Sequence, residues 1–170
     1  YRDGQQAALQ QGLQRSCVQI LSQPEVQQSP MLKRWVCLCI FKFCEDFGWS
    51  KYVGIAENGH TQLYPLLEDP DPTVRASAVL ALGEMFGASE PGNQAADGST
   101  NVNTPFGAGS ELGAGDSTVQ LQTLRESEQE LAIQILESCT DGSVIVRKEA
   151  LIALSKFMSI SAHASCLALV

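Results

Sequence analysis

One pattern that occurs twice constrains the fold of this chain most: an aspartate, a short turn, the pair Val-Arg, and then an apolar run. It is found as DPDPTVRASAVLALG at residues 69–83 and as DGSVIVRKEALIALS at residues 141–155, so the copies are 72 residues apart. In the first copy Asp71 can cap a helix, and Pro72 is favoured at a first helical position because its missing N–H needs no partner there. Each apolar run is therefore predicted to be a helix with an abrupt start.

A weaker copy, SPMLKRWVCLCI at residues 29–40, precedes these two at an offset of 42 residues. A period of about 40 residues is typical of HEAT-type repeats, each of which is a pair of helices. The larger offset between the later copies is explained by residues 89–118, which are rich in Gly, Ser, Asn and Thr and contain no Lys or Arg. Such a segment buries too little apolar surface to offset its chain entropy and is predicted to be disordered.

The predicted fold class is therefore all-α, a HEAT/armadillo-like α-solenoid of about three helix pairs with one long disordered insert. Repeats one and two should occupy residues 1–88, the insert residues 89–118, and the third repeat with the start of a fourth residues 119–170. Helices are expected at residues 5–22, 30–47, 58–68, 72–86, 120–138 and 143–158, with another beginning in the tail, SAHASCLALV. Pro65 should kink the helix at 58–68 or truncate its first half.

The second helix of each pair is apolar around most of its circumference. In the helix at 72–86, one stripe consists of Val74, Ala78, Leu82 and Met85, and further apolar residues widen it. A helix of this kind must be covered on more than one side. In a solenoid, its own first helix and the neighbouring repeats would provide that cover.

The repeated Asp and Arg form the one charged pattern in these copies. An arginine near a helix N-terminus opposes the helix dipole, so a nearby carboxylate should compensate. We expect a ladder in which Asp69 and Asp141 pair with Arg75 and Arg147 of the same or the adjacent repeat; an anion-binding groove built from the arginines is the alternative. The first repeat has Gln27 and Lys33 at these positions. Because lysine cannot make the bidentate contact, this is the end where the ladder is expected to be missing.

No pattern in the sequence points to catalysis, and no catalytic, cofactor-binding or metal-binding residue is assigned. The net charge of −8 makes duplex nucleic acid an unlikely ligand, and no apolar run reaches the ~20 residues of a membrane span. Only His60 and His163 could serve in a Ser-His-Asp arrangement, and no Gly-x-Ser-x-Gly elbow is present. The cysteines include no Cys-x-x-Cys pair and are interpreted as reduced, buried thiols: Cys17, Cys37, Cys39, Cys44, Cys139 and Cys166.

Three smaller features leave alternatives open. Trp35, Trp49 and Tyr52 lie near the end of the first repeat, where they either pack at a helix corner or anchor a partner. The adjacent acids Glu45 and Asp46 are interpreted as solvated. Within the insert, Thr104-Pro105 would suit a proline-directed kinase, and the insert has further hydroxyl groups at Ser89, Ser99, Thr100, Ser110, Ser117 and Thr118.

Four segments together resemble the helical-repeat region of the Raptor family, the regulatory scaffold subunits of target-of-rapamycin (TOR) complex 1: YRDGQQAALQ, LKRWVCLCI, LYPLLEDPDPTVRASAVLALG and DGSVIVRKEALIALS. The third is also explained by a generic HEAT consensus, whereas the first and last are not. The resemblance covers nearly all of the chain except the insert, which looks lengthened.

The resemblance implies a non-catalytic scaffold without a cofactor. It implies that the repeats pack against the helical repeats of the TOR kinase and other complex subunits, and help to present TOR substrates indirectly. It also implies work in the cytoplasm at the lysosomal or vacuolar surface, with no nucleic acid partner and no direct membrane insertion. The alternatives are a generic HEAT-repeat scaffold of nuclear transport or phosphatase regulation, and a small helical enzyme.

Overall fold

The computed structural model describes residues 1–86 and 116–167, and in the last two helices it describes side chains only for residue 122 and residues 125–159. Every regular element in these ranges is a helix, so the predicted all-α class is confirmed. The helices are α1 (Arg2–Gln10), α2 (Leu13–Leu21), α3 (Pro24–Gln27), α4 (Pro30–Cys44), α5 (Gly48–Ala56), the 3-10 helix η1 (Tyr64–Glu68), α6 (Pro72–Glu84), α7 (Asp116–Ser138) and α8 (Val144–Leu167).

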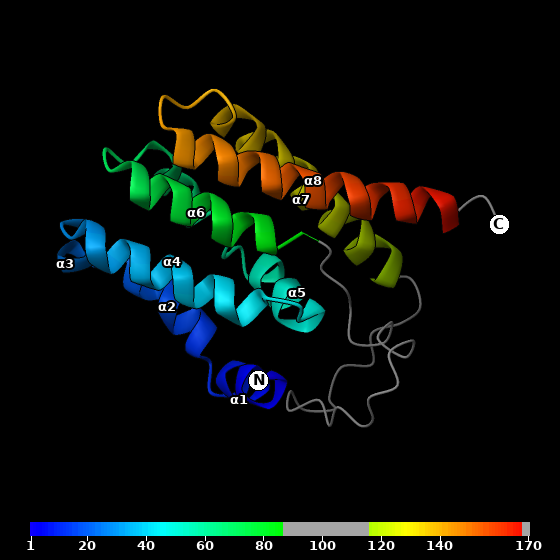
Figure 1. Cartoon of the computed structure of the whole chain (residues 1–170). Coiled ribbons are helices and arrows are strands. Elements are labelled where there is room, and N and C mark those ends of the chain that lie inside the picture. The colour runs from blue at the N-terminus through cyan, green and yellow to red at the C-terminus, as the bar shows by residue number, and fades with distance from the viewer. Residues whose placement is uncertain (87–115, 168–170) are drawn as a thin grey trace.

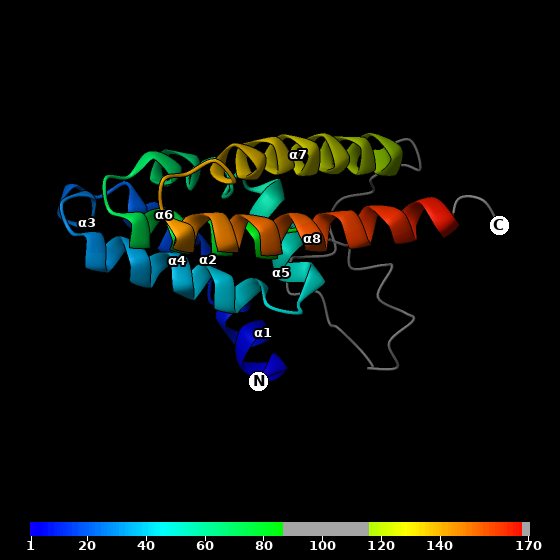
Figure 2. The same ribbon diagram turned by 45° about the horizontal axis from the view of Figure 1, so that its top comes forward.

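The helices form an inner row and an outer row. The inner row consists of α4, α6 and α8, which run side by side, with α6 in contact with both of the others (Figure 1). In the outer row α2 packs on α4, η1 packs on α6, and α7 packs on α8, as the turned view also shows (Figure 2). This arrangement of paired helices stacked one repeat after another is the predicted solenoid.

The starts of the inner helices follow from local sequence. The Ser29 side chain accepts a hydrogen bond from the backbone N–H of Leu32 at 3.4 Å, and Pro30 follows in the first turn. At α6, Asp71 Oδ1 accepts from the Thr73 N–H at 2.8 Å and Pro72 begins the helix. Both side chains satisfy amide groups that the first helical turn leaves unpaired, as predicted for the second of these helices.

Helix α6 is the centre of the core. Nine of its thirteen residues are buried, and they are distributed around the whole helix. At Gly83 of α6 an added Cβ would lie 2.4 Å from the Cβ of Ala153 of α8. The close approach of these two helices therefore requires a glycine at residue 83. The prediction that this helix is covered on more than one side is confirmed.

The N-terminal helix was expected to run unbroken over residues 5–22, which is wrong. The chain forms α1 and α2 instead, and Gly12 between them has a φ of 70°. A left-handed backbone conformation cannot continue a right-handed helix, and glycine adopts it without steric cost. On these two helices Leu13 is exposed, while Gln5 and Gln14 are buried.

The second repeat begins differently from its prediction. The expected helix at 58–68 is absent; the α-helix of this region is α5, and only the 3-10 helix η1 lies inside the predicted range. Asn58 has a φ of 55°, which stops a helix there, and Pro65 lies in the first turn of η1. The part of the predicted range before η1 is not helical, which is compatible with the truncation expected from Pro65, and α5 had not been predicted.

Two other boundaries differ at the C-terminal side. Helix α7 begins at Asp116, inside the predicted insert, and α8 continues to Leu167, so the tail expected to start a separate helix extends α8 instead. Residues 89–115 of the insert lie outside the described residues. The division into residues 1–88, 89–118 and 119–170 stays a prediction.

The first repeat copies the others only in part. Leu32 has an exposed fraction of 43%, whereas Val74 and Val146, at the corresponding positions, are buried. The buried face of α4 begins one residue later and consists of Lys33, Cys37, Ile40 and Cys44. Lys33 therefore keeps the position of Arg75 in the repeat, whereas Leu32 does not take the buried place that Val74 has in α6.

Candidate functional site

The expected ladder is present between the second and third repeats. Arg75, in the first turn of α6, donates from Nε to Asp141 Oδ2 at 2.7 Å and from Nη2 to Asp141 Oδ1 at 2.9 Å. Asp141 lies in the turn between α7 and α8, and these hydrogen bonds hold the pKa of its carboxyl group below the ordinary value. A bidentate contact of this kind fixes both distance and orientation between neighbouring repeats.

Between the first and second repeats the ladder continues with a lysine. Lys33 Nζ donates to Asp69 Oδ2, and both side chains are buried. The other oxygen, Asp69 Oδ1, accepts from the Asp71 N–H at 2.9 Å. The expectation that this end lacks the ladder is therefore wrong, because one ammonium group within reach of one carboxylate oxygen is enough when both are shielded from water.

Arg147 repeats the local geometry of Arg75 without its carboxylate. Its Nη1 donates to the backbone oxygens of Asp141 at 2.7 Å and Gly142 at 3.0 Å. Arg75 Nη1 makes the matching contacts to Asp69 O at 2.7 Å and Pro70 O at 3.3 Å. Since Lys33 and Arg75 are already paired with carboxylates, the ladder is favoured over an open anion-binding groove.

A second charged cluster, at the other end of the inner row, was not predicted. Glu84 is buried; its Oε1 accepts from Lys51 Nζ of α5 at 3.1 Å, and its Oε2 accepts from Lys156 Nζ of α8. Lys51 also donates to the backbone oxygen of Phe86 at 3.2 Å. A glutamate at the end of an otherwise apolar helix is the only sequence signal for this cluster.

An aromatic groove lies between α1, α2 and α5. Trp49 and Tyr52 stack with ring centroids 5.2 Å apart and an angle of 11° between planes. Together with Leu9 and Val53 they line a hollow of about 460 Å³. Trp35 is not part of it: it lies on α4 with an exposed fraction of 59%, so the structure brings together two of the three aromatic residues grouped from the sequence.

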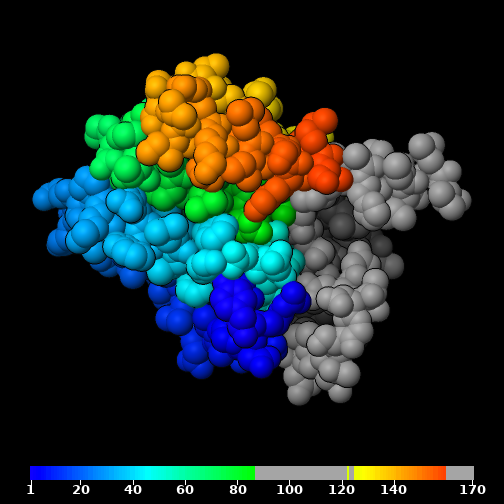
Figure 3. Space-filling model, in the orientation of Figure 1, coloured from blue at the N-terminus to red at the C-terminus, as the bar shows by residue number. Residues whose placement is uncertain are grey.

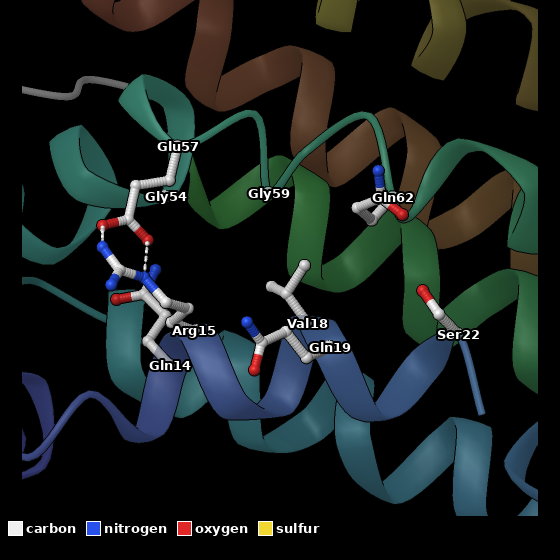
Figure 4. A pocket seen from close by; sticks show the side chains of 9 residues that line it. All are labelled: Gln14, Arg15, Val18, Gln19, Ser22, Gly54, Glu57, Gly59 and Gln62. Carbon is white, nitrogen blue, oxygen red and sulfur yellow. Dashed lines mark hydrogen bonds and ion pairs between the residues drawn. The ribbon is translucent and has the colours of Figure 1, made fainter.

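Figure 4 shows an adjoining hollow of about 370 Å³, which has Gln14, Arg15 and Glu57 in common with the lining of the aromatic groove. There Arg15 and Glu57 point toward each other and form an ion pair, with Arg15 Nε donating to Glu57 Oε2 at 3.1 Å. Beneath them the buried Gln14 exchanges hydrogen bonds with Ser50: its Nε2 donates to Ser50 O at 3.1 Å, and Ser50 Oγ donates to its Oε1 at 2.7 Å. Because Arg15 is paired with Glu57 and the Gln14 amide is fully hydrogen-bonded, none of these groups is available as a general acid or base. This arrangement favours a role in binding another protein over a role in catalysis.

The remaining titratable side chains that the structure describes do not assemble into a reactive site. Burial raises the pKa of the Cys37 and Cys44 thiols to about 12, so both stay protonated near neutral pH. Cys39 is exposed, against the prediction of buried cysteines. Hydrogen bonding from Lys42 and then Tyr1 lowers the pKa of Glu45 below its ordinary value, so this acid, which was interpreted as solvated, is paired at the surface. Among the residues with described positions, no three His, Cys, Asp or Glu side chains are placed to hold a metal ion.

Other residues singled out from the sequence can be placed only in part. His60 is buried against the edge of Tyr64 with ring centroids 5.8 Å apart. The side chains of His163 and Cys166, the motif Thr104-Pro105 and the hydroxyl groups of the insert lie outside the described residues. Of the helices that the structure describes, none combines the length and apolar character needed to cross a membrane.

Comparisons with known proteins agree with the arrangement of the repeats. A HEAT repeat model matches residues 61–87, which include η1 and α6. "Regulatory-associated protein of TOR 2" of Oryza sativa is 34% identical over 161 residues, which are 92% of this chain and 10% of that protein. "Target of rapamycin complex 1 subunit mip1" of Schizosaccharomyces pombe is 27% identical over 93% of this chain and 10% of its own length.

The crystal structure of Chaetomium thermophilum Raptor superposes on the chain with a TM-score of 0.68 and 27% sequence identity. The match covers 96% of this chain and 12% of that one, and the chain spans about a tenth of the length of the two curated relatives. The resemblance seen in the four sequence segments is thus confirmed over almost the whole chain, which belongs to the Raptor family as a segment of its HEAT-repeat region.

Proposed function

We propose that this chain is a non-catalytic scaffold segment of a TOR complex 1, which packs against the helical repeats of the TOR kinase and helps to position substrates beside it. The observation that carries the proposal is the similarity over more than nine-tenths of the chain to proteins named as TOR regulators and TOR complex 1 subunits. We extend to this chain the cytoplasmic location at the lysosomal or vacuolar surface that the family resemblance implies.

The mechanism of such a segment is positional. Stacked repeats hold each other through the contacts Lys33–Asp69, Arg75–Asp141 and Lys156–Glu84, so a surface on one repeat keeps a fixed place relative to the next. A protein bound to a rigid support meets a second bound protein at a high effective concentration without any new contact between them. Substrate presentation needs no catalytic group on the scaffold.

The aromatic groove is the surface we assign to the kinase contact. Its lining combines Trp49 and Tyr52 with Leu9, Val53 and several glutamines, and aromatic anchors in hollows dominate binding energy at protein interfaces. The paired Arg15 and Glu57 at its edge would form part of a polar rim. The two hollows described above are lined by no histidine, and the one carboxylate on their shared edge is paired, which argues against the small-enzyme alternative.

The experiment is affinity purification of the natural full-length protein carrying Trp49→Ser and Tyr52→Ser, with Trp35→Ser as the matched control. The groove variant should recover several-fold less TOR kinase, because loss of an anchor costs about 2 kcal/mol or more. Trp35→Ser, at a tryptophan that is exposed on α4 and lies outside the groove, should recover the normal amount.

Three outcomes would contradict the proposal in different ways. Equal recovery from all variants would remove the groove as the contact. Failure of the unchanged protein to recover the kinase would remove the function itself. Recovery of the small GTPase Ran or a phosphatase catalytic subunit in place of the kinase would favour the generic HEAT scaffold.

A further inference from the structure

Helix α5 faces two different parts of the molecule with its two sides. Four of its residues line the aromatic groove, and their steps of three and four place them on one side of the helix: Trp49, Tyr52, Val53 and Ala56. Lys51 lies on the other side, where its Nζ donates to Glu84 Oε1 at 3.1 Å and to the Phe86 oxygen at 3.2 Å. The wall of the groove is therefore tied through one lysine to the C-terminal end of α6.

Helix α5 buries little of its own surface in the core. Its buried residues are Ser50, Gly54 and Ile55, so one large apolar side chain is fully buried, and none of the described side chains caps its first turn. The Lys51 and Glu84 side chains have exposed fractions of only 13% and 6%. An ion pair shielded from water to this degree is stronger than one at the surface. The contact between Lys51 and Glu84 is therefore a main determinant of where α5 lies.

Glu84 is shared with the third repeat. Its Oε2 accepts from Lys156 Nζ of α8, while its Oε1 accepts from Lys51. Figure 3 shows these segments in order along the surface, with α8 in orange, α6 in green and the cyan residues that lead into α5. Two ammonium groups on one carboxylate repel each other and divide its attraction between them. Lys156 therefore weakens the hold of Glu84 on Lys51, although it lines neither of the two hollows described above.

We propose that Glu84 positions the aromatic groove, because it holds Lys51, and with it α5, in place against α6. Lys156 moderates this hold from the third repeat. Glu84 and Lys156 do not line the groove, so both act through α5 and neither would contact a protein bound there. The effect on kinase binding rests on the function proposed above, whereas the position of Trp49 can be measured without any partner.

The first test follows Trp49 in the 170-residue chain carrying Trp35→Phe, which leaves Trp49 as its one tryptophan. Acrylamide quenching of its fluorescence is measured without denaturant, after circular dichroism has shown that each variant is folded. Lys51→Met and Glu84→Gln should each raise the quenching constant about twofold or more, because α5 then moves away from the groove. Lys148→Met, at an exposed lysine of α8, should leave it unchanged. Unchanged quenching in both Lys51→Met and Glu84→Gln would overturn the proposal.

Lys156→Met distinguishes this positioning role from a general loss of stability. With Lys156 removed, Lys51 no longer shares the carboxylate, so quenching of Trp49 should fall. The thermal midpoint should decrease at the same time, because the junction between α6 and α8 loses a contact. A purely structural role of Glu84 predicts that both lysine variants loosen the molecule alike. Quenching that rises in Lys156→Met as it does in Lys51→Met would therefore overturn the proposal.

The second test measures the recovery of TOR kinase by the natural full-length protein. Lys51→Met should recover several-fold less kinase, because the aromatic anchors are displaced, and Lys156→Met should recover at least the normal amount. Normal recovery by Lys51→Met, together with a loss for the groove variant, would keep the groove as the kinase contact and overturn its positioning by Glu84. Raised quenching in Lys51→Met without any loss of recovery would instead support the positioning and remove the kinase assignment.

Discussion

Helices α6 and α8 have closely related sequences and different surroundings. Both follow the Asp-turn-Val-Arg pattern, and Val74 and Val146 are buried alike at the first apolar position. On the other side, α6 is covered by α8 while α8 is exposed at the matching positions. In a repeat fold the pattern of a helix therefore specifies which faces can be covered, and the presence of a neighbour decides which faces are covered.

The largest expected effect tests this difference directly. Phe86→Ala should lower the free energy of unfolding by about 3–5 kcal/mol, because it removes a buried ring that packs on Phe157 and leaves a cavity. Met158→Ala, at the corresponding position of α8, should change it by less than about 0.5 kcal/mol in the 170-residue chain. Urea unfolding followed by circular dichroism measures both, and equal costs would mean that the surface of α8 is covered in solution.

A somewhat smaller effect is expected for the ladder between the first and second repeats. Lys33→Met should cost about 3 kcal/mol, because it leaves the buried carboxylate of Asp69 without its cation. Replacing both residues, Lys33→Met with Asp69→Asn, should recover part of the loss, since no unpaired charge then remains. Asparagine keeps an Oδ1 that can accept from the Asp71 N–H, so a double variant less stable than Lys33→Met alone in urea unfolding would contradict the assignment of the loss to an unpaired buried charge.

The parts of the fold that could be predicted are those specified by local sequence. The caps and prolines at residues 29–30 and 71–72 set the starts of α4 and α6, and the opposed helix dipole at Arg75 pointed to a carboxylate in the turn of the same or the adjacent repeat. Helix caps, prolines at helix starts and the helix dipole each involve a few residues close together in the chain, so their effects can be predicted without knowledge of the tertiary contacts.

The parts that could not be predicted depend on contacts between distant residues. The pairing of Glu84 with Lys51 and Lys156 joins three helices, and the aromatic groove exists only because α1 and α2 are bent apart at Gly12 and pack beside α5. The Lys33 contact does not follow from the shape of the lysine side chain, because it depends on how completely the site is shielded from water. Local sequence carries little of this information.

The close approach of α6 and α8 should be sensitive to a single methyl group. Gly83→Ala should destabilise the chain by about 1–3 kcal/mol, because the new Cβ would overlap Ala153 and force the two helices apart. Gly4→Ala, in a helix where an added Cβ meets nothing within 4 Å, should instead be neutral or stabilise by up to about 1 kcal/mol. Thermal unfolding compares the two variants, and a neutral Gly83→Ala would mean that the helices adjust without strain.

The smallest expected effect concerns the outer cover of α6, where His60 precedes η1. Burial lowers the pKa of His60 below its ordinary value of 6.5, and the charge of Glu130 on α7 only partly opposes this shift. The unfolded chain therefore takes up a proton at this residue before the folded chain does, so stability should fall as the pH decreases from 6.5 toward the lower folded pKa. His60→Phe retains a ring beside Tyr64 but cannot titrate, and it should flatten this part of the stability curve. Urea unfolding between pH 7.5 and about pH 5 measures the slope of the unfolding free energy against pH for both proteins. If the slope is the same with and without His60, the segment around His60 opens easily enough to admit the charged imidazole. The outer cover of α6 would then be weaker than its contacts with α4 and α8.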